Sequence, residues 1–270
     1  MELDIKNKNH SEVYEKAFGK KLHNDEARKR LYGIKDYLSS LEDTEQQEIN
    51  NNESRVLVIP DLHAPFTKEG FLEFCIKMYN KYNCNQVVFL GDEVDNHYSS
   101  FHDTDPDGLS ANDELDKAID IIGKFYEAFP IAKVCYGNHS LIPNRKAFNA
   151  GLSKRWIRTI DEVLKVPNWD YKEEHIIDGV SYVHGTGRKA RARAISSMYS
   201  VVQGHYHNES YVEFKVGTGS KRVFAMQLGS GIDREAYAFA YAKPFGECHL
   251  NVGIVIAGKL PIIEYFEEMC

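Results

Sequence analysis

One local pattern occurs five times along this chain: a short apolar run typical of a buried β-strand, followed directly by Asp, Asn or His. The first two runs cover 56–59 and 87–90, and the others end at positions 136, 183 and 202. The polar segments that follow them are Asp61-Leu62-His63, Gly91-Asp92, Gly137-Asn138-His139, His184-Gly185 and Gly204-His205-Tyr206-His207. Ligand-binding groups in α/β sheets lie at the carboxyl ends of strands. We therefore expect one convergent site, whose carboxylate and imidazole groups suit manganese, iron or zinc better than calcium.

The spacing of apolar residues predicts how the strands are connected. Helical spacing separates the first three predicted strands, at 71–82 and at 115–125, and this β-α-β alternation predicts a parallel-type sheet covered by helices. After Gly204 the pattern changes to strands in hairpins near 211–214, 222–228, 248–256 and 261–266, with turn signals at 217–220 and 257–259. Together the two regions predict the fold class: α/β, a two-sheet α/β sandwich with flanking helices.

The order of the polar segments carries a family resemblance. D-x-H, GD-x-x-D, GNH, H and G-H-x-H, in this order, closely resemble the motifs of the calcineurin-like metallophosphoesterases, from about Arg55 to the C-terminus. The layout is similar to that of the stand-alone enzymes of bacteria and bacteriophages. Taken singly, each segment could be a loop residue that caps a helix or a turn, but the ordered set of five favours the family. The resemblance implies the same sandwich fold and a centre that holds two metal ions.

The resemblance also implies which residues bind metal. One ion would be held by Asp61, His63, Asp92 and His207, and the other by Asp92, Asn138, His184 and His205. Asp92 is thus the candidate bridge between two divalent ions roughly 3.5–4 Å apart. We expect Mn²⁺, with Fe, Zn or Ni as alternatives. A water molecule that bridges the pair would become acidic and act as a hydroxide nucleophile.

Two further residues are candidates for catalysis. His139 follows the predicted ligand Asn138, and in the family pattern this position protonates the leaving oxygen, a task that suits an imidazole with a pKa near working pH. Asp95 completes GD-x-x-D and either orients His139 or caps a helix. The chain departs from the phosphoprotein phosphatases, which have Arg-Gly after GD-x-x-D where this chain has Asn96-His97, and commonly Glu or Asp at the position of Ser140. Both departures argue against a phosphoprotein phosphatase.

A basic run lies shortly after His184. It begins at position 188 and carries four positive charges in six residues. The run either contacts phosphates of the substrate or is an exposed helix face. Our candidates for substrate binding are Arg188, Arg191 and Arg193.

Residues 1–54 differ in character from the rest. They are charged and helix-prone, with amphipathic spacing over 27–41 and an acidic stretch over 42–53. We predict a helical N-terminal arm and acidic linker at 1–54 and the metallophosphoesterase domain at 55–270. The arm contacts a partner or DNA, or it is an appendage that packs on the core or on a second subunit, which would make a homo-oligomer.

Composition excludes several classes of protein. The net charge of −7 gives no global basic footprint for nucleic acid, although a metal cluster and a local basic stripe can hold phosphates. No apolar run approaches the roughly 20 residues that span a bilayer, and the N-terminal residues lack a signal-peptide pattern. We therefore expect a cytoplasmic protein with no membrane partner. The five cysteines contain no CxxC pair, which argues against a disulfide framework.

The preferred function is a two-metal phosphoesterase, a metal-dependent phosphoric ester hydrolase, whose substrate and partner is a nucleic acid or a nucleotide. The alternative within the same chemistry is a phosphomonoesterase that acts on a small metabolite or a phosphoprotein. The alternative from another class is an inactive binding scaffold, against which the complete set of predicted ligands argues.

Overall fold

The computed structural model describes residues 9–18, 21–27, 29, 31, 53–100, 108–216, 222–240 and 247–267. The chain divides into two compact units, Met1–Glu53 and Ser54–Cys270. In the first unit, α1 (His10–Phe18) is tied to the next turn, because the Ser11 N–H donates to Asn24 Oδ1 at 3.0 Å. Ala27 and Leu31, from the predicted amphipathic stripe, are fully buried. Most of the predicted acidic linker lies outside the described residues.

The second unit contains two mixed sheets. The six-stranded sheet has the order β11-β10-β1-β2-β3-β4 and is formed by β1 (Arg55–Ile59), β2 (Gln86–Phe89), β3 (Ala132–Cys135), β4 (Trp169–Lys172), β10 (Asn251–Ile256) and β11 (Leu260–Tyr265). The five-stranded sheet has the order β5-β6-β7-β9-β8 and is formed by β5 (Glu174–Ile177), β6 (Val180–Val183), β7 (Ser200–Gln203), β8 (Tyr211–Val216) and β9 (Arg222–Gln227). Strands β1 to β4 run parallel, as do β6, β7 and β9, and the remaining pairings are antiparallel.

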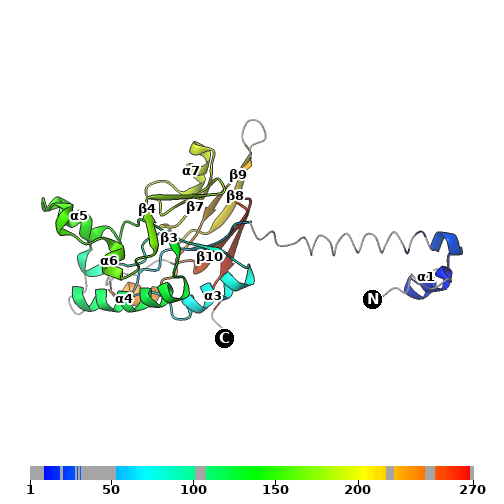
Figure 1. The fold of residues 1–270 in the computed structure, drawn as a ribbon, viewed down its shortest axis with the longest axis horizontal. Coiled ribbons are helices and arrows are strands. Elements are labelled where there is room, and N and C mark those ends of the chain that lie inside the picture. The colour runs from blue at the N-terminus through cyan, green and yellow to red at the C-terminus, as the bar shows by residue number, and fades with distance from the viewer. Residues whose placement is uncertain are drawn as a thin grey trace. The chain divides into compact units, whose positions relative to one another are not determined.

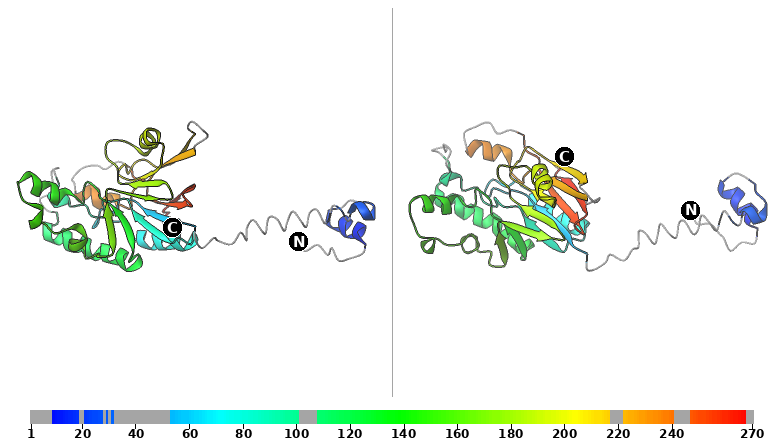
Figure 2. Two further views of the ribbon diagram at one scale, coloured as in Figure 1. Left: turned by 45° about the horizontal axis from the view of Figure 1, so that its top comes forward. Right: turned by 90° about the horizontal axis from the view of Figure 1, so that it is seen from above.

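Helices cover the outer faces of both sheets (Figures 1 and 2). On the six-stranded sheet lie α3 (Phe71–Lys81) and α4 (Ala111–Ala128), which match the predicted helical stretches. On the five-stranded sheet lies α7 (Ala190–Ser197), which packs on β7 and β9. The remaining helices are η1 (His97–Ser99), α5 (Ile142–Asn149), η2 (Lys154–Trp156), α6 (Ile160–Leu164) and α8 (Arg234–Ala240). The predicted α/β sandwich with flanking helices is confirmed.

The first strand is apolar throughout because both of its faces are buried. Val56 and Val58 pack between the two sheets with residues such as Tyr182, whereas Leu57 and Ile59 pack beneath the helices. Strands buried on both faces have continuous apolar runs instead of alternation. Strands β1, β2, β3, β6 and β7 are buried along most of their length and therefore carry strong sequence signals, and the polar residues that follow them lie at one edge of their sheet. The parallel strand β4 is mostly exposed and has no such signal. In the described part of the chain, no helix has the length and apolar character needed to cross a bilayer.

Candidate metal centre

All seven predicted ligands lie just beyond the carboxyl ends of parallel strands. The six-stranded sheet contributes four of them, after β1, β2 and β3: Asp61, His63, Asp92 and Asn138. The five-stranded sheet contributes three, after the neighbouring strands β6 and β7: His184, His205 and His207. The site is therefore built from both layers of the sandwich.

The carboxylates and imidazoles form three groups that could hold a metal ion. The first cluster is Asp61, His63 and His207, and the second cluster is Asp92, His184 and His205. A third group, of His63, Asp95 and His139, shares His63 with the first cluster. Within each cluster the ligand-type atoms lie within 4.8 Å of one another. The first cluster holds three of the four ligands expected for one ion, and the second cluster holds three of the four expected for the other. These clustered residues could bind a dinuclear metal centre.

The Asp92 carboxylate lies between the two clusters. Its Oδ1 accepts hydrogen bonds from the backbone N–H groups of His139 at 2.7 Å and Ser140 at 3.2 Å. Its Oδ2 then faces the imidazoles, 3.2 Å from His184 Nε2 and 3.9 Å from His63 Nε2. Asp92 would therefore be the ligand that two bound ions share.

Hydrogen bonds behind the site orient two of the imidazoles. His184 Nδ1 lies 3.1 Å from the Leu90 carbonyl oxygen, and His63 Nδ1 lies 2.6 Å from Asp95 Oδ1. Each contact uses the Nδ1 proton and leaves the Nε2 lone pair facing the site. Partners of this kind fix the tautomer and the ring orientation of histidines that bind metal.

The atoms around His184 Nε2 fit a cation. Nε2 lies 2.8 Å from Asn138 Oδ1, 3.2 Å from Asp92 Oδ2 and 3.2 Å from His205 Nδ1. With its Nδ1 proton donated to Leu90, the His184 ring presents a lone pair to other electron-rich atoms. A metal ion, or a second proton on His184, relieves their repulsion.

The first cluster also fits a metal ion. His63 Nε2 is buried and has no hydrogen-bond partner among the described residues. A buried polar atom without a partner is costly unless a ligand satisfies it. On the other side of the same cluster, His207 Nε2 lies 3.1 Å from Asp61 Oδ2. The residues present therefore fit an ion in each cluster.

The electrostatics of the site favour positive charge. Burial raises the pKa values of Asp92 and Asp61, but the charge of His184, together with hydrogen bonds and charges from the neighbouring histidines, lowers both below the usual range for Asp. Burial lowers the pKa of His184, but the charges of Asp92 and Asp61 outweigh it and raise that pKa to about 9. A site that binds a proton this tightly also attracts a metal ion.

Two glycines of the motifs, Gly137 and Gly204, are explained by how closely their backbone approaches the carboxylates of Asp92 and Asp61. His63, Asp92 and His205 adopt left-handed backbone, with φ values of 48°, 48° and 71°, a conformation that costs on the order of 1–3 kcal/mol for such residues. A Cβ atom on Gly137 would lie 2.0 Å from Asp92 Oδ1, and one on Gly204 would lie 2.3 Å from Asp61 Oδ1. Glycine at these two positions lets the loops close over the carboxylates.

Asp95 contacts two imidazoles at once. Its Oδ1 lies 2.6 Å from His63 Nδ1 and 3.1 Å from His139 Nδ1, and its backbone oxygen lies 2.9 Å from the same His139 atom. Burial lowers the pKa of His139, but the hydrogen bond to Asp95 and the charge of Asp92 raise it to about 9. The His139 side chain is 19% exposed, against 1% for His63, so a substrate can reach the His139 ring.

The buried Glu93 and the half-buried Tyr171 support the loop after β3, and the sequence alone marked neither of them. Glu93 accepts hydrogen bonds from Ser140 Oγ at 2.9 Å and from the Tyr171 hydroxyl at 3.0 Å. Burial raises the pKa of Glu93 to about 7. Because Glu93 directly follows a candidate ligand and Tyr171 lies far away in the sequence, no local pattern predicts their contact.

Two buried glutamines hold the loops of the second sheet. Gln203 Nε2 donates to the Arg188 carbonyl oxygen at 2.8 Å, and Gln227 Nε2 donates to the Gly204 carbonyl oxygen at 2.6 Å. Both glutamines are fully buried. Each ends an apolar strand run, and this signal could have marked them in the sequence.

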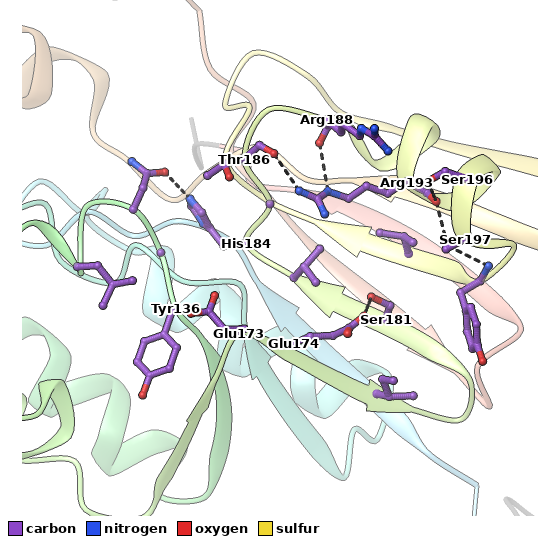
Figure 3. A pocket seen from close by; sticks show the side chains of 18 of the residues that line it. Tyr136, Glu173, Glu174, Ser181, His184, Thr186, Arg188, Arg193, Ser196 and Ser197 are labelled. Atoms are coloured by element: carbon purple, nitrogen blue, oxygen red, sulfur yellow. Dashed lines mark hydrogen bonds between the residues drawn. The ribbon is translucent and has the colours of Figure 1, made fainter. Parts of the chain in front are cut away.

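A cleft of about 800 Å³ opens beside the second cluster (Figure 3). It reaches Asn138 and His184 at one side and is lined further along by Arg188 and Arg193. Its volume is typical of a site for a small ligand. Arg193 also shapes the loop after His184, because its Nη2 donates to the Thr186 carbonyl oxygen at 2.9 Å.

The three arginines proposed for substrate binding are not all in this cleft. Arg188 is exposed and has no carboxylate partner among the residues that the structure describes. Arg191 instead forms an ion pair with Glu213 and lies over the Tyr211 ring, 5.1 Å from its centroid. The structure therefore brings Arg188 and Arg193 to the cleft and places Arg191 in contact with β8.

The structure thus brings the residues of the five polar segments together, with Asp92 of the second cluster facing the first and His139 beside Asp95. The fold is the predicted two-sheet α/β sandwich, and the ordered polar segments that resemble those of the calcineurin-like metallophosphoesterases meet at one edge of it.

No protein-family model matches the chain, and no curated protein matches it by sequence. Among solved structures, this chain is similar to an archaeal phosphodiesterase, with a TM-score of 0.43 and 17% identity over 78% of this chain and 99% of that chain. It is also similar to the nuclease MPE of Pseudomonas putida, with a TM-score of 0.33 and 12% identity over 77% and 86% of the two chains. A third similar structure is vacuolar protein sorting 29 of Cryptosporidium parvum, with a TM-score of 0.34 and 13% identity over 80% and 99%. Because these TM-scores are below 0.5, we base the function on the geometry of the site.

Proposed function

We propose that this chain is a two-metal phosphoesterase that hydrolyses phosphate esters of a nucleic acid or a nucleotide. The observation that carries the proposal is the pair of Asp and His clusters on either side of Asp92 Oδ2, next to an arginine-lined cleft. One ion would be held by Asp61, His63, Asp92 and His207, and the other by Asp92, Asn138, His184 and His205. Bound divalent ions, for which we propose Mn²⁺ with Fe, Zn or Ni as alternatives, would supply Lewis acidity and lower the pKa of water.

His139 is the proposed general acid. Its Nδ1 atom is held by Asp95, so the proton for the leaving oxygen is carried on Nε2. The raised pKa of His139 keeps this proton in place near neutral pH, and its partial exposure gives a substrate access to it. Asp95 acts as a positioning residue for His139 and for the ligand His63.

The cleft supports a substrate that extends beyond a single phosphate group. Arg188 and Arg193 provide positive charge on one side, and polar and aromatic side chains such as Ser196 and Tyr199 line it further out. Phosphate contacts from basic side chains position a nucleotide or nucleic acid without reading its sequence.

The proposal is tested by metal analysis and a substrate panel. Purified protein loaded with Mn²⁺ should contain about two ions per chain and should lose hydrolysis on treatment with EDTA. The panel contains an aryl phosphate monoester, its bis-aryl diester, cyclic nucleotides, and single- and double-stranded DNA. Highest relative rates on the nucleotides or on DNA support the proposal.

The other outcomes of the panel separate the alternatives. Turnover limited to the monoester would favour a phosphatase for a metabolite or a phosphoprotein. Bound metal without turnover of any ester would favour a binding scaffold. Activity that persists in EDTA, in a protein without bound metal, would contradict the two-metal mechanism itself.

A further inference from the structure

The segment that follows the GNH motif is strongly basic in an acidic protein. Between Ser140 and Ile160 the chain has five basic residues and no acidic one, although its net charge is −7. The segment contains α5, a turn at Gly151 and η2, which contacts α5. We refer to residues 142–158 as the basic hairpin. Its helix α5 projects at one end of the sandwich unit (Figures 1 and 2).

The backbone of the basic hairpin is closed by its own hydrogen bonds. The Leu152 N–H donates to the Ala147 carbonyl oxygen at 2.9 Å, and the Trp156 N–H donates to the Ser153 carbonyl oxygen at 3.0 Å. The Ile157 N–H donates to the Lys154 carbonyl oxygen at 3.1 Å. The side chains of the hairpin are therefore presented by ordered turns.

Large apolar side chains of the basic hairpin face solvent. Trp156 is 84% exposed, Phe148 is 76% exposed and Leu152 is 53% exposed. Exposed apolar patches of this kind mark interaction surfaces. The ring of Trp156 is thus almost wholly open to a binding partner.

Positive charge surrounds these aromatic rings. Lys154, Arg155 and Arg158 are exposed, and none of them has a carboxylate within ion-pair distance among the described residues. Exposed cations next to exposed aromatic rings are the combination that binds single-stranded nucleic acid, in which phosphates contact the cations and bases stack on the rings. Charge complementarity thus points to a polyanion as the occupant.

The basic hairpin is continuous with the candidate active site. A second cleft, of about 570 Å³, is lined by Phe148, Lys154 and Arg158 from the hairpin. Four residues line both this cleft and the one beside the metal centre: Tyr136, Leu141, Arg145 and Glu173. A ligand bound at the metal centre can therefore extend along these shared walls to the hairpin.

We propose that the basic hairpin binds the part of a single-stranded nucleic acid that extends beyond the scissile phosphate. Trp156 and Phe148 stack on unpaired bases, and Lys154, Arg155 and Arg158 contact backbone phosphates. The inference rests on the proposed function and narrows its substrate class. Double-stranded nucleic acid fits less well, because paired bases do not offer their faces to an aromatic ring.

The binding test uses the full-length protein loaded with Mn²⁺ and a fluorescent oligothymidylate of about 15 nucleotides, with phosphorothioate linkages to slow hydrolysis. Trp156→Ala should weaken binding about 5- to 150-fold, the range that follows from ~1–3 kcal/mol per stacked base. Trp156→Phe keeps a ring and should retain most of the affinity. The triple variant Lys154→Gln/Arg155→Gln/Arg158→Gln should reduce the slope of log K against log salt by about 2, at about 0.7 per phosphate contact.

The matched control removes charge elsewhere on the surface. Lys117 and Lys124 are exposed on α4, and Lys117→Gln/Lys124→Gln should leave the affinity and the salt slope unchanged. The thermal transition of every variant is measured alongside, so that a loss of fold is distinguished from a loss of contacts.

The tryptophans provide a second readout. The chain has two of them: Trp156 is 84% exposed and Trp169 is 4% exposed. An oligonucleotide that stacks on Trp156 should quench the emission of the wild-type protein. The same oligonucleotide should leave the emission of Trp156→Phe unchanged, because only the buried Trp169 remains.

The outcomes separate this inference from the proposed function. If the wild-type protein hydrolyses the bis-aryl diester but does not bind the oligonucleotide, or if the α4 control loses as much affinity as the triple variant, the inference is wrong and the proposed function stands. If the protein binds the oligonucleotide as described but hydrolyses no ester, the proposed function is wrong and the binding surface stands. A change of oligomeric state in Trp156→Ala would overturn the inference, because the hairpin would then be an interface between copies of this chain.

Discussion

At the scale of single residues, Asp92 connects more of the site than any other side chain described here. Its Oδ2 faces both clusters, and its Oδ1 accepts two backbone N–H groups of the loop after β3. We expect Asp92→Ala to lose both metal ions and all detectable turnover, whereas Asp61→Ala should retain the ion of the second cluster. Metal content measured by inductively coupled plasma mass spectrometry checks this. Equal metal loss in the two variants would show that Asp92 is not shared.

The second prediction at this scale concerns His139, which lies outside both clusters and is held by Asp95. His139→Ala should keep the metal content and lower kcat by roughly 10²–10⁴-fold, the usual contribution of a positioned general acid. The loss should shrink for aryl esters with acidic leaving groups, because these depart without protonation. A loss that is the same across a series of leaving groups would make His139 a structural or substrate-binding residue.

At the scale of elements, helix α7 divides the basic run between two sides. Ala190 and Ala194 are buried against β7 and β9, so Arg191 and Arg193, which follow and precede them, project on opposite flanks of the helix. We predict that Arg193→Ala lowers kcat/KM on a nucleotide or polynucleotide roughly 10- to 150-fold, the equivalent of ~1.5–3 kcal/mol for a hydrogen bond to a charged group. Arg191→Ala is the matched control and should change little beyond its exposed ion pair with Glu213. Comparable losses in both variants would contradict this division.

At the scale of the whole molecule, metal binding should stabilise the fold, and increasingly so as the pH rises. The pKa of His184 is raised from 6.5 to about 9, so its protonation stabilises the metal-free fold fully below pH 6.5, and this contribution is lost as the pH rises through 9. A metal ion replaces that proton, so the loaded protein lacks this dependence. The difference in Tm between Mn²⁺-loaded and EDTA-treated protein should therefore grow between pH 7 and pH 8.5. A difference independent of pH would mean that His184 releases no proton on metal binding.

The sequence predicted what depends on local pattern and on the order of motifs. Strands β1, β2, β3, β6 and β7 are mostly buried and therefore have strong signals, and residues at their ends meet because parallel strands share an edge. The mostly exposed β4 has no such signal and was not predicted. The direction of Arg191 depended on which face of α7 is buried, and the burial of Glu93 depended on the distant Tyr171. The exposure of Trp156 was equally hidden, because an aromatic residue between turns is usually part of a core. The direction or burial of these side chains depends on contacts between distant segments, and such contacts produce no periodic pattern in a short stretch of sequence.

The candidate centre is built from loops of both sheets. Bound ions would therefore link the two layers of the sandwich through their ligands. The link already exists in part, because the His205 N–H of the second layer donates to Asp61 Oδ2 of the first at 3.0 Å. When the ions leave, a proton on His184 replaces only part of their positive charge, so we expect the two layers to separate more often. A chain that opens more often is cleaved more often by proteases. Metal starvation would therefore lower the amount of this protein in a cell as well as its rate of turnover.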